Sequence, residues 1–279
     1  MTSIKGAAVA LTGAASGIGR ALARELAARG ADLALADIDE PRLVALADEL
    51  RQSHQVNISA HRVNVAEEDE IKRFAEAAIR QHPRLSVLIN NAGVALQGWF
   101  EEMTLADFEW VMSINFWGVV RGTHYFLPHL MAQPEAHIVN LSSIFGLIAP
   151  VGQTAYSASK FGVRGFTEAL QHELAATSVR VTSVHPGGVA TNIANNSRAV
   201  KAVDAERKAA ASKRFSELAK TTPEQAASVI VEGMLQNKPR VLIGGDARFI
   251  DRLQRWLPTG YWRVVAYLNN YPARPGAQK

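Results

Sequence analysis

Cysteine is absent from this sequence, and its absence excludes several kinds of chemistry. A chain without thiols has no disulfide bond, no thiolate nucleophile and no zinc or iron–sulfur centre held by cysteine. Long apolar runs are also missing, since no stretch reaches the roughly 18 apolar residues of a membrane-spanning helix. The apolar segment 7–12, with Lys5 as the sole charge before it, is too short for a secretory signal. We therefore expect a cytoplasmic protein whose fold is stabilised without covalent cross-links.

No region of the chain concentrates charge of one sign. The 279 residues include 30 basic and 26 acidic side chains, a net charge of +4, and the basic residues are scattered. This distribution argues against a nucleic-acid partner. The histidines show no metal-ligand spacing, so we expect no metal site. With 48% hydrophobic residues and no linker, repeat or low-complexity block, we expect one domain over residues 1–279.

Short apolar runs alternate with longer amphipathic ones along most of the chain. Runs that are apolar on both faces predict strands of a parallel sheet, and the amphipathic stretches predict helices that cover it. The alternation predicts an α/β fold, a doubly wound parallel sheet of about seven strands flanked by helices on both faces. Ligands of such sheets bind beyond the carboxyl ends of the strands. The expected strands are 7–12, 33–37, 60–65, 85–90, 137–142, 179–185 and 241–244, and the expected helices are 17–29, 41–52, 67–81, 104–132, 156–176 and 223–236.

A glycine-rich turn follows the first expected strand. Gly13, Gly17 and Gly19, with Ser16 and Ile18 among them, lead directly into the first expected helix. Bare backbone amides and the positive end of a helix favour binding of a pyrophosphate. The glycine spacing is wider than in the usual dinucleotide fingerprint, and a plain tight turn is the alternative. The position between strand and helix favours a dinucleotide-binding turn.

An acidic residue, Asp37, ends the second expected strand. A carboxylate there can accept hydrogen bonds from an adenosine ribose, whereas it would repel the 2′-phosphate of NADP. Neither Ser16 nor Ile38 offers a positive charge to offset that repulsion, although Arg20 and Arg42 are near in the sequence. The alternative is an acidic residue that leads the next helix. We expect NAD as the cofactor in preference to NADP.

Tyr156 and Lys160 are the most informative pair in the sequence. Helical positions four apart share a face, so the phenol and the ammonium would point into the same cleft. A free tyrosine titrates near 10, and lowering its pKa by roughly three units requires about 4 kcal/mol. One positive charge about 4 Å away supplies roughly that amount at an effective dielectric constant near 20. Alone, the pair could be a chance surface feature, but with the glycine turn it indicates a proton donor beside a cation.

Further motifs follow the expected strands in order. With them the chain resembles the short-chain dehydrogenase/reductase family from about residue 7 to residue 245. The resemblance implies a Rossmann-type fold and hydride exchange with a nicotinamide cofactor. The motifs are the glycine turn, Asn90-Asn91-Ala92-Gly93, Asn115, Ser142-Ser143, Tyr156 with Lys160, and Pro186-Gly187 with Thr191.

The resemblance implies a catalytic set of Asn115, Ser143, Tyr156 and Lys160. Ser143 would position the substrate oxygen and Tyr156 would donate or withdraw a proton. Lys160 would hold the nicotinamide ribose and lower the tyrosine pKa, and Asn115 would hold a water that links Lys160 to solvent. The cofactor contacts that the resemblance implies are Gly13, Ser16, Gly17, Ile18, Gly19, Asp37, Asn64, Val65, Asn91, Ala92, Gly93, Tyr156, Lys160, Pro186, Gly187, Val189 and Thr191.

Asn64 stands where the family commonly has an aspartate against the adenine amino group, and its amide oxygen can still accept that hydrogen bond. His185 lies next to Pro186, where we expect it to pack or bond locally rather than act as a base. The expected substrate contacts, which flank the proton donor, are Ser143, Phe145, Gln153 and Tyr156.

Two regions of the second half are expected to shape the substrate site or the assembly. Residues 192–222 are irregular and then basic, which favours a substrate lid. Residues 246–279 form an apolar extension whose spacing predicts one amphipathic helix that stops at Pro258. Packing against the core or another subunit is the favoured interpretation, and pocket closure and membrane-surface attachment are the alternatives. The family resemblance implies a homodimer or homotetramer.

The predicted function is interconversion of a hydrophobic secondary alcohol and its ketone with NAD(H). Leu96, Trp99 and Phe100 would add an apolar wall to the substrate site. Two alternatives stay open: a ketoreductase of acyl thioesters on acyl-carrier protein or CoA, suggested by the basic lid, and a non-catalytic dinucleotide-sensing protein. A complete catalytic set argues against the sensing protein, which would not need all its members.

Overall fold

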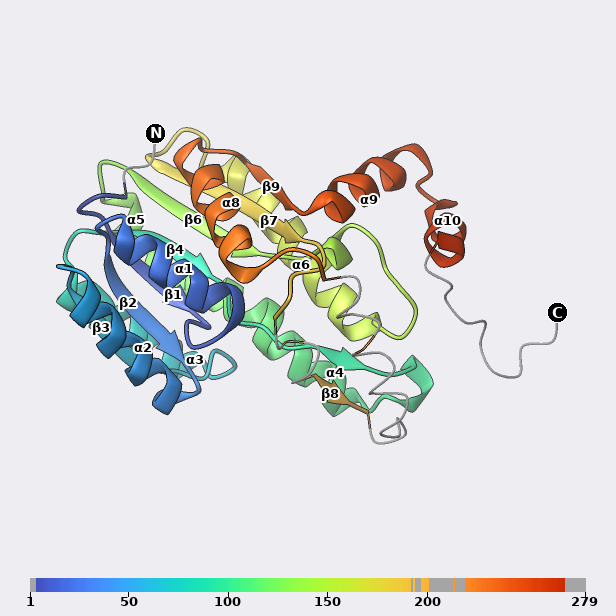
Figure 1. Cartoon of the computed structure of the whole chain (residues 1–279), viewed down its shortest axis with the longest axis horizontal. Coiled ribbons are helices and arrows are strands. Elements are labelled where there is room, and N and C mark those ends of the chain that lie inside the picture. The colour runs from blue at the N-terminus through green and yellow to red at the C-terminus, as the bar shows by residue number, and fades with distance from the viewer. Residues whose placement is uncertain (1–3, 192, 194–196, 201–212, 214–218, 269–279) are drawn as a thin grey trace.

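In the computed structural model, which describes residues 4–191, 193, 197–200, 213 and 219–268, the chain forms a seven-stranded parallel sheet with helices on both faces (Figure 1). Its strands are β1 (Ala8–Thr12), β2 (Asp32–Asp37), β3 (Ile58–Arg62), β4 (Leu85–Asn90), β6 (Ala136–Leu141), β7 (Val179–Pro186) and β9 (Arg240–Ile243). Their order is β3-β2-β1-β4-β6-β7-β9, so the doubly wound, Rossmann-type arrangement expected from the sequence is confirmed.

The central strands are apolar on both faces because two separate cores cover the sheet. In β1, Val9 and Leu11 belong to one core, whereas Ala8 and Ala10 belong to the other. Successive side chains of a strand point to opposite faces, so a strand buried on both sides needs an uninterrupted apolar run. This requirement explains the continuous apolar runs of the sequence.

Helices on each face supply the other half of each core. One core takes apolar side chains from α1 (Gly17–Ala28), α2 (Glu40–Ser53) and α8 (Pro223–Leu235), and the other from α3 (Glu68–Gln81), α5 (Gly118–Met131) and α6 (Thr154–Glu173). Pro41 and Pro223 stand in the first turns of α2 and α8, where the missing N–H costs nothing. Thr222 caps α8 through its hydroxyl, which accepts from the Gln225 amide at 3.2 Å.

The helix expected over 104–132 is interrupted. A π-helical turn, η2 (Ser113–Trp117), joins α4 (Leu105–Met112) to α5 and carries the buried Asn115 at its centre. Such turns place one extra residue in a helix and are frequent at functional sites. A second, two-stranded sheet pairs β5 (Leu96–Gln97) with β8 (Arg198–Ala199). Neither the π turn nor the small sheet was expected, because both are too short to produce a recognisable hydrophobic periodicity in the sequence.

The carboxyl-terminal extension differs from the single helix expected. α9 (Gly245–Trp256) ends just before Pro258, as the sequence predicted, but a second helix, α10 (Tyr261–Leu268), follows. Figure 1 shows both helices projecting from one end of the sheet. Most of the expected lid, 192–222, lies outside the residues that the structure describes. No helix in the described part of the chain is long and apolar enough to cross a membrane.

Strand order determines where a ligand can bind. The chain proceeds outward in one direction from β1 to β3 and in the other from β4 to β9, so the direction reverses between β1 and β4. The loops that leave the carboxyl ends of β1 and β4 diverge at this point and leave a crevice. The glycine turn follows β1, and Asn91 begins the loop after β4.

Candidate active site

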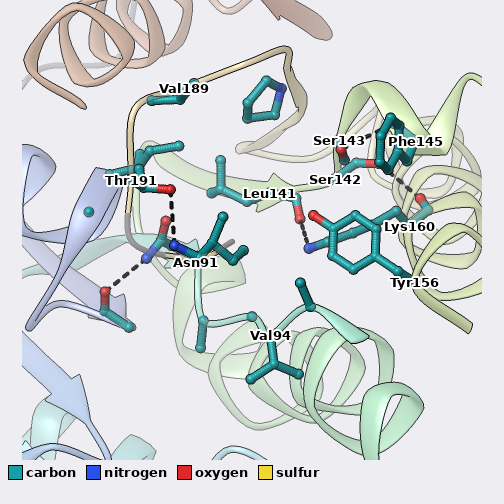
Figure 2. A pocket seen from close by; sticks show the side chains of 18 of the residues that line it. Asn91, Val94, Leu141, Ser142, Ser143, Phe145, Tyr156, Lys160, Val189 and Thr191 are labelled. Atoms are coloured by element: carbon teal, nitrogen blue, oxygen red, sulfur yellow. Dashed lines mark hydrogen bonds between the residues drawn. The ribbon is translucent and has the colours of Figure 1, made fainter. Parts of the chain in front are cut away.

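A cavity of about 860 Å³ lies beyond the carboxyl ends of the strands. Its lining runs from the glycine turn, past the ends of β2, β4, β6 and β7, to α9 and α10. Each cofactor and substrate contact expected from the sequence lines this cavity, and several of them are shown in Figure 2. Of the expected catalytic set, Ser143, Tyr156 and Lys160 line it and Asn115 does not.

The glycine turn is fixed against the loop after β4. Gly13 has a φ of +68°, and a Cβ at this position would lie 2.8 Å from Ala92 Cα, so the site requires glycine. The Asn91 side-chain amide donates hydrogen bonds to the carbonyl oxygens of Thr12 and Gly13, both at 3.0 Å. The turn therefore holds its backbone amides at the N-terminus of α1, where they can bind a phosphate group.

Asp37, at the end of β2, is hydrogen-bonded to the same turn. Its Oδ2 accepts a hydrogen bond from the Ala15 amide at 2.8 Å, and its Oδ1 accepts one from the Asp39 amide at 3.0 Å. A carboxylate has about four acceptor positions, so each oxygen can accept a further hydrogen bond from a ribose hydroxyl. Asp37 thus holds the backbone of the glycine turn and also lines the cavity.

Tyr156 and Lys160 lie one turn apart on α6 and line the cavity together (Figure 2). Lys160 is buried, and its Nζ donates a hydrogen bond to the Leu141 carbonyl oxygen at 2.8 Å. The same Nζ lies 5.8 Å from the centroid of the Tyr156 ring. Ser143 follows β6, and its Oγ accepts from the Phe145 amide at 3.1 Å, which begins a short 3₁₀ turn. These contacts bring a phenol, an ammonium and a hydroxyl to one end of the cavity.

Burial is the main cause of the pKa shifts of Tyr156 and Lys160. Burial raises the pKa of Tyr156, and an interaction with the Ser143 hydroxyl offsets part of the rise. Burial also lowers the pKa of Lys160 to about 8. The net shift of the Tyr156 pKa in the protein by itself is therefore upward, and the lowering by Lys160 that the resemblance implies stays a prediction. The ammonium lies beside the ring face and donates to Leu141 rather than to the phenolic oxygen.

The Asn115 side chain is fully buried and fixes the loop next to the cavity. Its Oδ1 accepts from the Val94 amide at 2.8 Å, and its Nδ2 donates to the Val94 carbonyl oxygen at 3.0 Å. Nδ2 also donates to Ser159 Oγ at 3.1 Å, directly before Lys160 on α6. The π turn thus ties the loop after β4 to the helix that carries the proton donor. The expected water at Asn115 stays a prediction.

His185 supports the backbone at Ser143. Its Nδ1 lies 3.1 Å from the Ser143 carbonyl oxygen, and its Nε2 lies 2.9 Å from Ser183 Oγ. The carbonyl can only accept, so Nδ1 carries the hydrogen and Nε2 accepts from the serine hydroxyl. Burial lowers the pKa of His185 to about 3. The local hydrogen-bonding role expected for this histidine is confirmed.

Asp246 is a cavity residue that sequence reasoning missed. Its Oδ2 accepts a hydrogen bond from the Gly188 amide at 2.6 Å, and its carboxylate occupies the space that a side chain at Gly187 would need. Asp246 stands in the first turn of α9, remote in sequence from the Pro186-Gly187 loop that it holds. No local pattern could have shown this pairing.

α9 and α10 form an apolar wall of the cavity. Ile250 and Val265 are buried in one cluster with Ile148, and the Tyr261 hydroxyl accepts from the Ala149 amide at 3.2 Å. The extension therefore packs against the body of the protein, as the favoured interpretation expected, and it also forms one wall of the pocket. Leu96, Trp99 and Phe100 do not belong to the lining, so the apolar wall expected there is wrong. The apolar residues that line this end of the cavity are Ile144, Phe145, Ile148, Pro150, Phe249, Ile250, Val265 and Leu268.

Comparison with known proteins agrees with this geometry. A family profile described as short chain dehydrogenase matches residues 7–202. The "Putative oxidoreductase SadH" of Mycobacterium tuberculosis (strain H37Rv) is 42% identical over 268 residues, which are 95% of this chain and 96% of that protein. A short chain dehydrogenase/reductase of Burkholderia phymatum, solved in complex with NAD, has a TM-score of 0.86 and 29% identity over 100% of both chains.

A further solved structure shows the other form of the cofactor. The short-chain dehydrogenase of Sphingobium yanoikuyae in complex with NADPH has a TM-score of 0.75 and 25% identity, and the alignment covers 98% of both chains. Similar folds therefore hold NAD in one relative and NADPH in another. The family profile and the identity to SadH decide the classification. The chain belongs to the short-chain dehydrogenase/reductase family, and it is an oxidoreductase.

Proposed function

We propose that the protein interconverts a hydrophobic secondary alcohol and its ketone by hydride exchange with NAD(H). One observation supports this proposal above the others. The glycine turn, the Tyr156 and Lys160 pair with Ser143, and the apolar wall of α9 and α10 line one cavity. A phosphate-binding turn, a proton donor and an apolar binding surface are the parts that the reaction requires.

The cavity residues fit a nicotinamide dinucleotide. A Cβ at Gly93 would lie 3.5 Å from Lys160 Nζ, so glycine keeps the approach to the ammonium open. An ammonium has three N–H groups, and the Leu141 carbonyl takes one, which leaves two for ribose hydroxyls. The glycine turn would hold the pyrophosphate, Lys160 the nicotinamide ribose and Asp37 the adenosine ribose. When bound, the cofactor supplies the acceptor or donor of the hydride.

The charges around Asp37 support NAD over NADP. A 2′-phosphate carries about two negative charges and would lie against the carboxylate. The two arginines nearby have acidic partners: Arg20 lies 3.2 Å from Glu49, and Arg42 lies 3.5 Å from Asp39. Each arginine would have to leave its own acidic partner before it could offset the repulsion. We therefore propose a preference for NAD.

Tyr156 is the proposed proton donor and acceptor. In reduction its hydroxyl would give a proton to the carbonyl oxygen, while the Ser143 hydroxyl holds that oxygen in place. In oxidation the phenolate would take the proton of the alcohol. The raised pKa of Tyr156 favours the protonated phenol at neutral pH, which is the form that reduction needs. A positive charge near the phenolic oxygen lowers that pKa and favours oxidation.

We also propose that the chain is one domain over 1–279 and assembles as a homodimer or homotetramer through α5 and α6. Trp117, directly before α5, and Phe161, within α6, are 47% and 38% exposed and would contribute apolar surface to such an interface. Trp117→Glu should lower the mass in solution, measured by light scattering. An unchanged mass would reject this interface.

A panel of ketones and alcohols tests the proposed function. Reaction is followed at the nicotinamide absorbance with NADH, NADPH, NAD and NADP in separate assays. Turnover of apolar ketones or secondary alcohols, faster with NADH or NAD, supports the proposal. Turnover of acyl thioesters alone would favour the ketoreductase alternative, and tight NADH binding without turnover of any compound would favour a sensing protein.

A further inference from the structure

α9 and α10 both expose aromatic and basic side chains. Trp256 is 85% exposed and Tyr267 is 83% exposed. Arg248 and Arg252 are exposed on α9, and helical spacing places both in line with Trp256, four positions apart. On α10, Arg263 and Tyr267 are also exposed and four positions apart. We call these exposed side chains of the two helices, Arg248, Arg252, Trp256, Arg263 and Tyr267, the outer face. Large exposed aromatic side chains beside basic ones are typical of a binding surface.

The outer face is positively charged. Residues 245–268 contain four arginines and two aspartates. Asp246 accepts from the Gly188 amide at 2.6 Å, and Asp251 pairs with Arg240 at 2.6 Å and with Arg255 of its own helix at 3.3 Å. The charge that remains outside comes from arginines. A second copy of this chain packed here by two-fold symmetry would set arginines against arginines, whereas an anionic surface complements them.

The helices that carry the outer face also carry side chains that line the cavity. Phe249 and Leu268 line the cavity, yet they are 49% and 57% exposed. Around the axis of α9, Phe249 stands between the outer face and the buried Ile250. Around the axis of α10, Leu268 stands between the outer face and the buried Val265. An apolar molecule that leaves the outer face would therefore contact Phe249 and Leu268 first and the buried apolar residues of the cavity next.

We propose that the outer face docks on an anionic lipid membrane and that the cavity opens toward the bilayer. Helices lie in the membrane interface when one side presents tryptophan or other apolar residues together with basic residues. Trp256 and Tyr267 would sit at the level of the lipid headgroups, and Arg248, Arg252 and Arg263 would contact anionic headgroups. Docking would let a hydrophobic substrate pass from the bilayer to the cavity without crossing water. This proposal concerns a binding surface and is independent of the redox reaction.

Vesicle co-sedimentation of the full chain tests the proposal without substrate or cofactor. One set of vesicles contains phosphatidylcholine alone, and the other contains equal amounts of phosphatidylcholine and phosphatidylglycerol. The wild type should bind the anionic vesicles and bind the neutral ones weakly. Arg248→Ser and Arg252→Ser should each weaken binding about fivefold, since a basic residue near an anionic surface contributes about 1 kcal/mol. Trp256→Ser should weaken it by at least about tenfold, because an apolar side chain no longer leaves water.

Exposed residues elsewhere provide matched controls. Arg73→Ser on α3 removes an exposed charge, and Leu105→Ser on α4 removes a side chain that is 76% exposed, and neither should change vesicle binding. Equal binding to neutral and anionic vesicles would overturn the proposal, as would unchanged binding of all three variants of the outer face. A lower solution mass of Trp256→Ser without any vesicle binding by the wild type would assign the face to a subunit contact instead.

Discussion

Lowering the pH from 7 to 5 should destabilise the protein through His185. The imidazole is buried, donates to the Ser143 carbonyl and accepts from Ser183, and its pKa is lowered to about 3. The unfolded chain binds a proton near pH 6.5, whereas the folded protein stays neutral there. Stability from this group is therefore complete above pH 6.5 and falls as the pH drops toward about 3. At pH 5 the loss is about 2 kcal/mol, from roughly 1.5 pH units at about 1.36 kcal/mol each.

Urea unfolding at pH 7 and pH 5 measures this effect. The protein concentration is kept constant, because association changes apparent stability. His185→Gln should reduce the pH dependence of the unfolding free energy by about 2 kcal/mol, whatever the substitution does to stability at pH 7. His124→Gln, which removes an exposed histidine of α5, is the control and should leave the pH dependence unchanged. A His185 variant with the same pH dependence as the wild type would show that His185 does not destabilise the protein at pH 5.

Two substitutions examine the cofactor end of the cavity. Asp37→Asn keeps an acceptor for the Ala15 amide but removes the charge, so the ratio of NADPH to NADH affinity, measured by fluorescence titration, should rise about tenfold. An unchanged ratio would remove Asp37 from the cofactor preference. Gly13→Ala should lower the unfolding free energy by at least about 1–2 kcal/mol because of its left-handed backbone and the nearby Ala92 Cα. Gly165→Ala, with open space around its position on α6, should not destabilise the protein, and equal losses at both sites would contradict the argument.

Local patterns made much of the site predictable from the sequence. Phosphate binding needs glycines at the junction of a strand and a helix, so the turn that contains Gly13 could be recognised from the sequence alone. The pairing of Tyr156 and Lys160 depends on helical spacing alone. The sheet was predictable for the same reason, because a strand buried on both faces requires a continuous apolar run.

Features that depend on contacts between distant segments could not be predicted in this way. Asp246 reaches the Gly188 amide from α9, and only the folded chain brings the two together. The apolar wall of α10 depends on a turn after Pro258 that returns Val265 to Ile148. The raised pKa of Tyr156 in the protein by itself was not predicted, because the sequence does not reveal how deeply the phenol is buried.

The proposed function depends on proton transfer by the Tyr156 hydroxyl. Its most direct test is the single-turnover rate of NADH oxidation by an apolar ketone that the wild type reduces. Tyr156→Phe should lower this rate by at least about 10², the lower range for a positioned acid or base, while NADH affinity stays unchanged. Tyr125→Phe, which removes a hydroxyl bonded to Glu68 at 2.6 Å on the surface, should keep the full rate. A Tyr156→Phe variant that reduces the ketone at the wild-type rate would contradict the account.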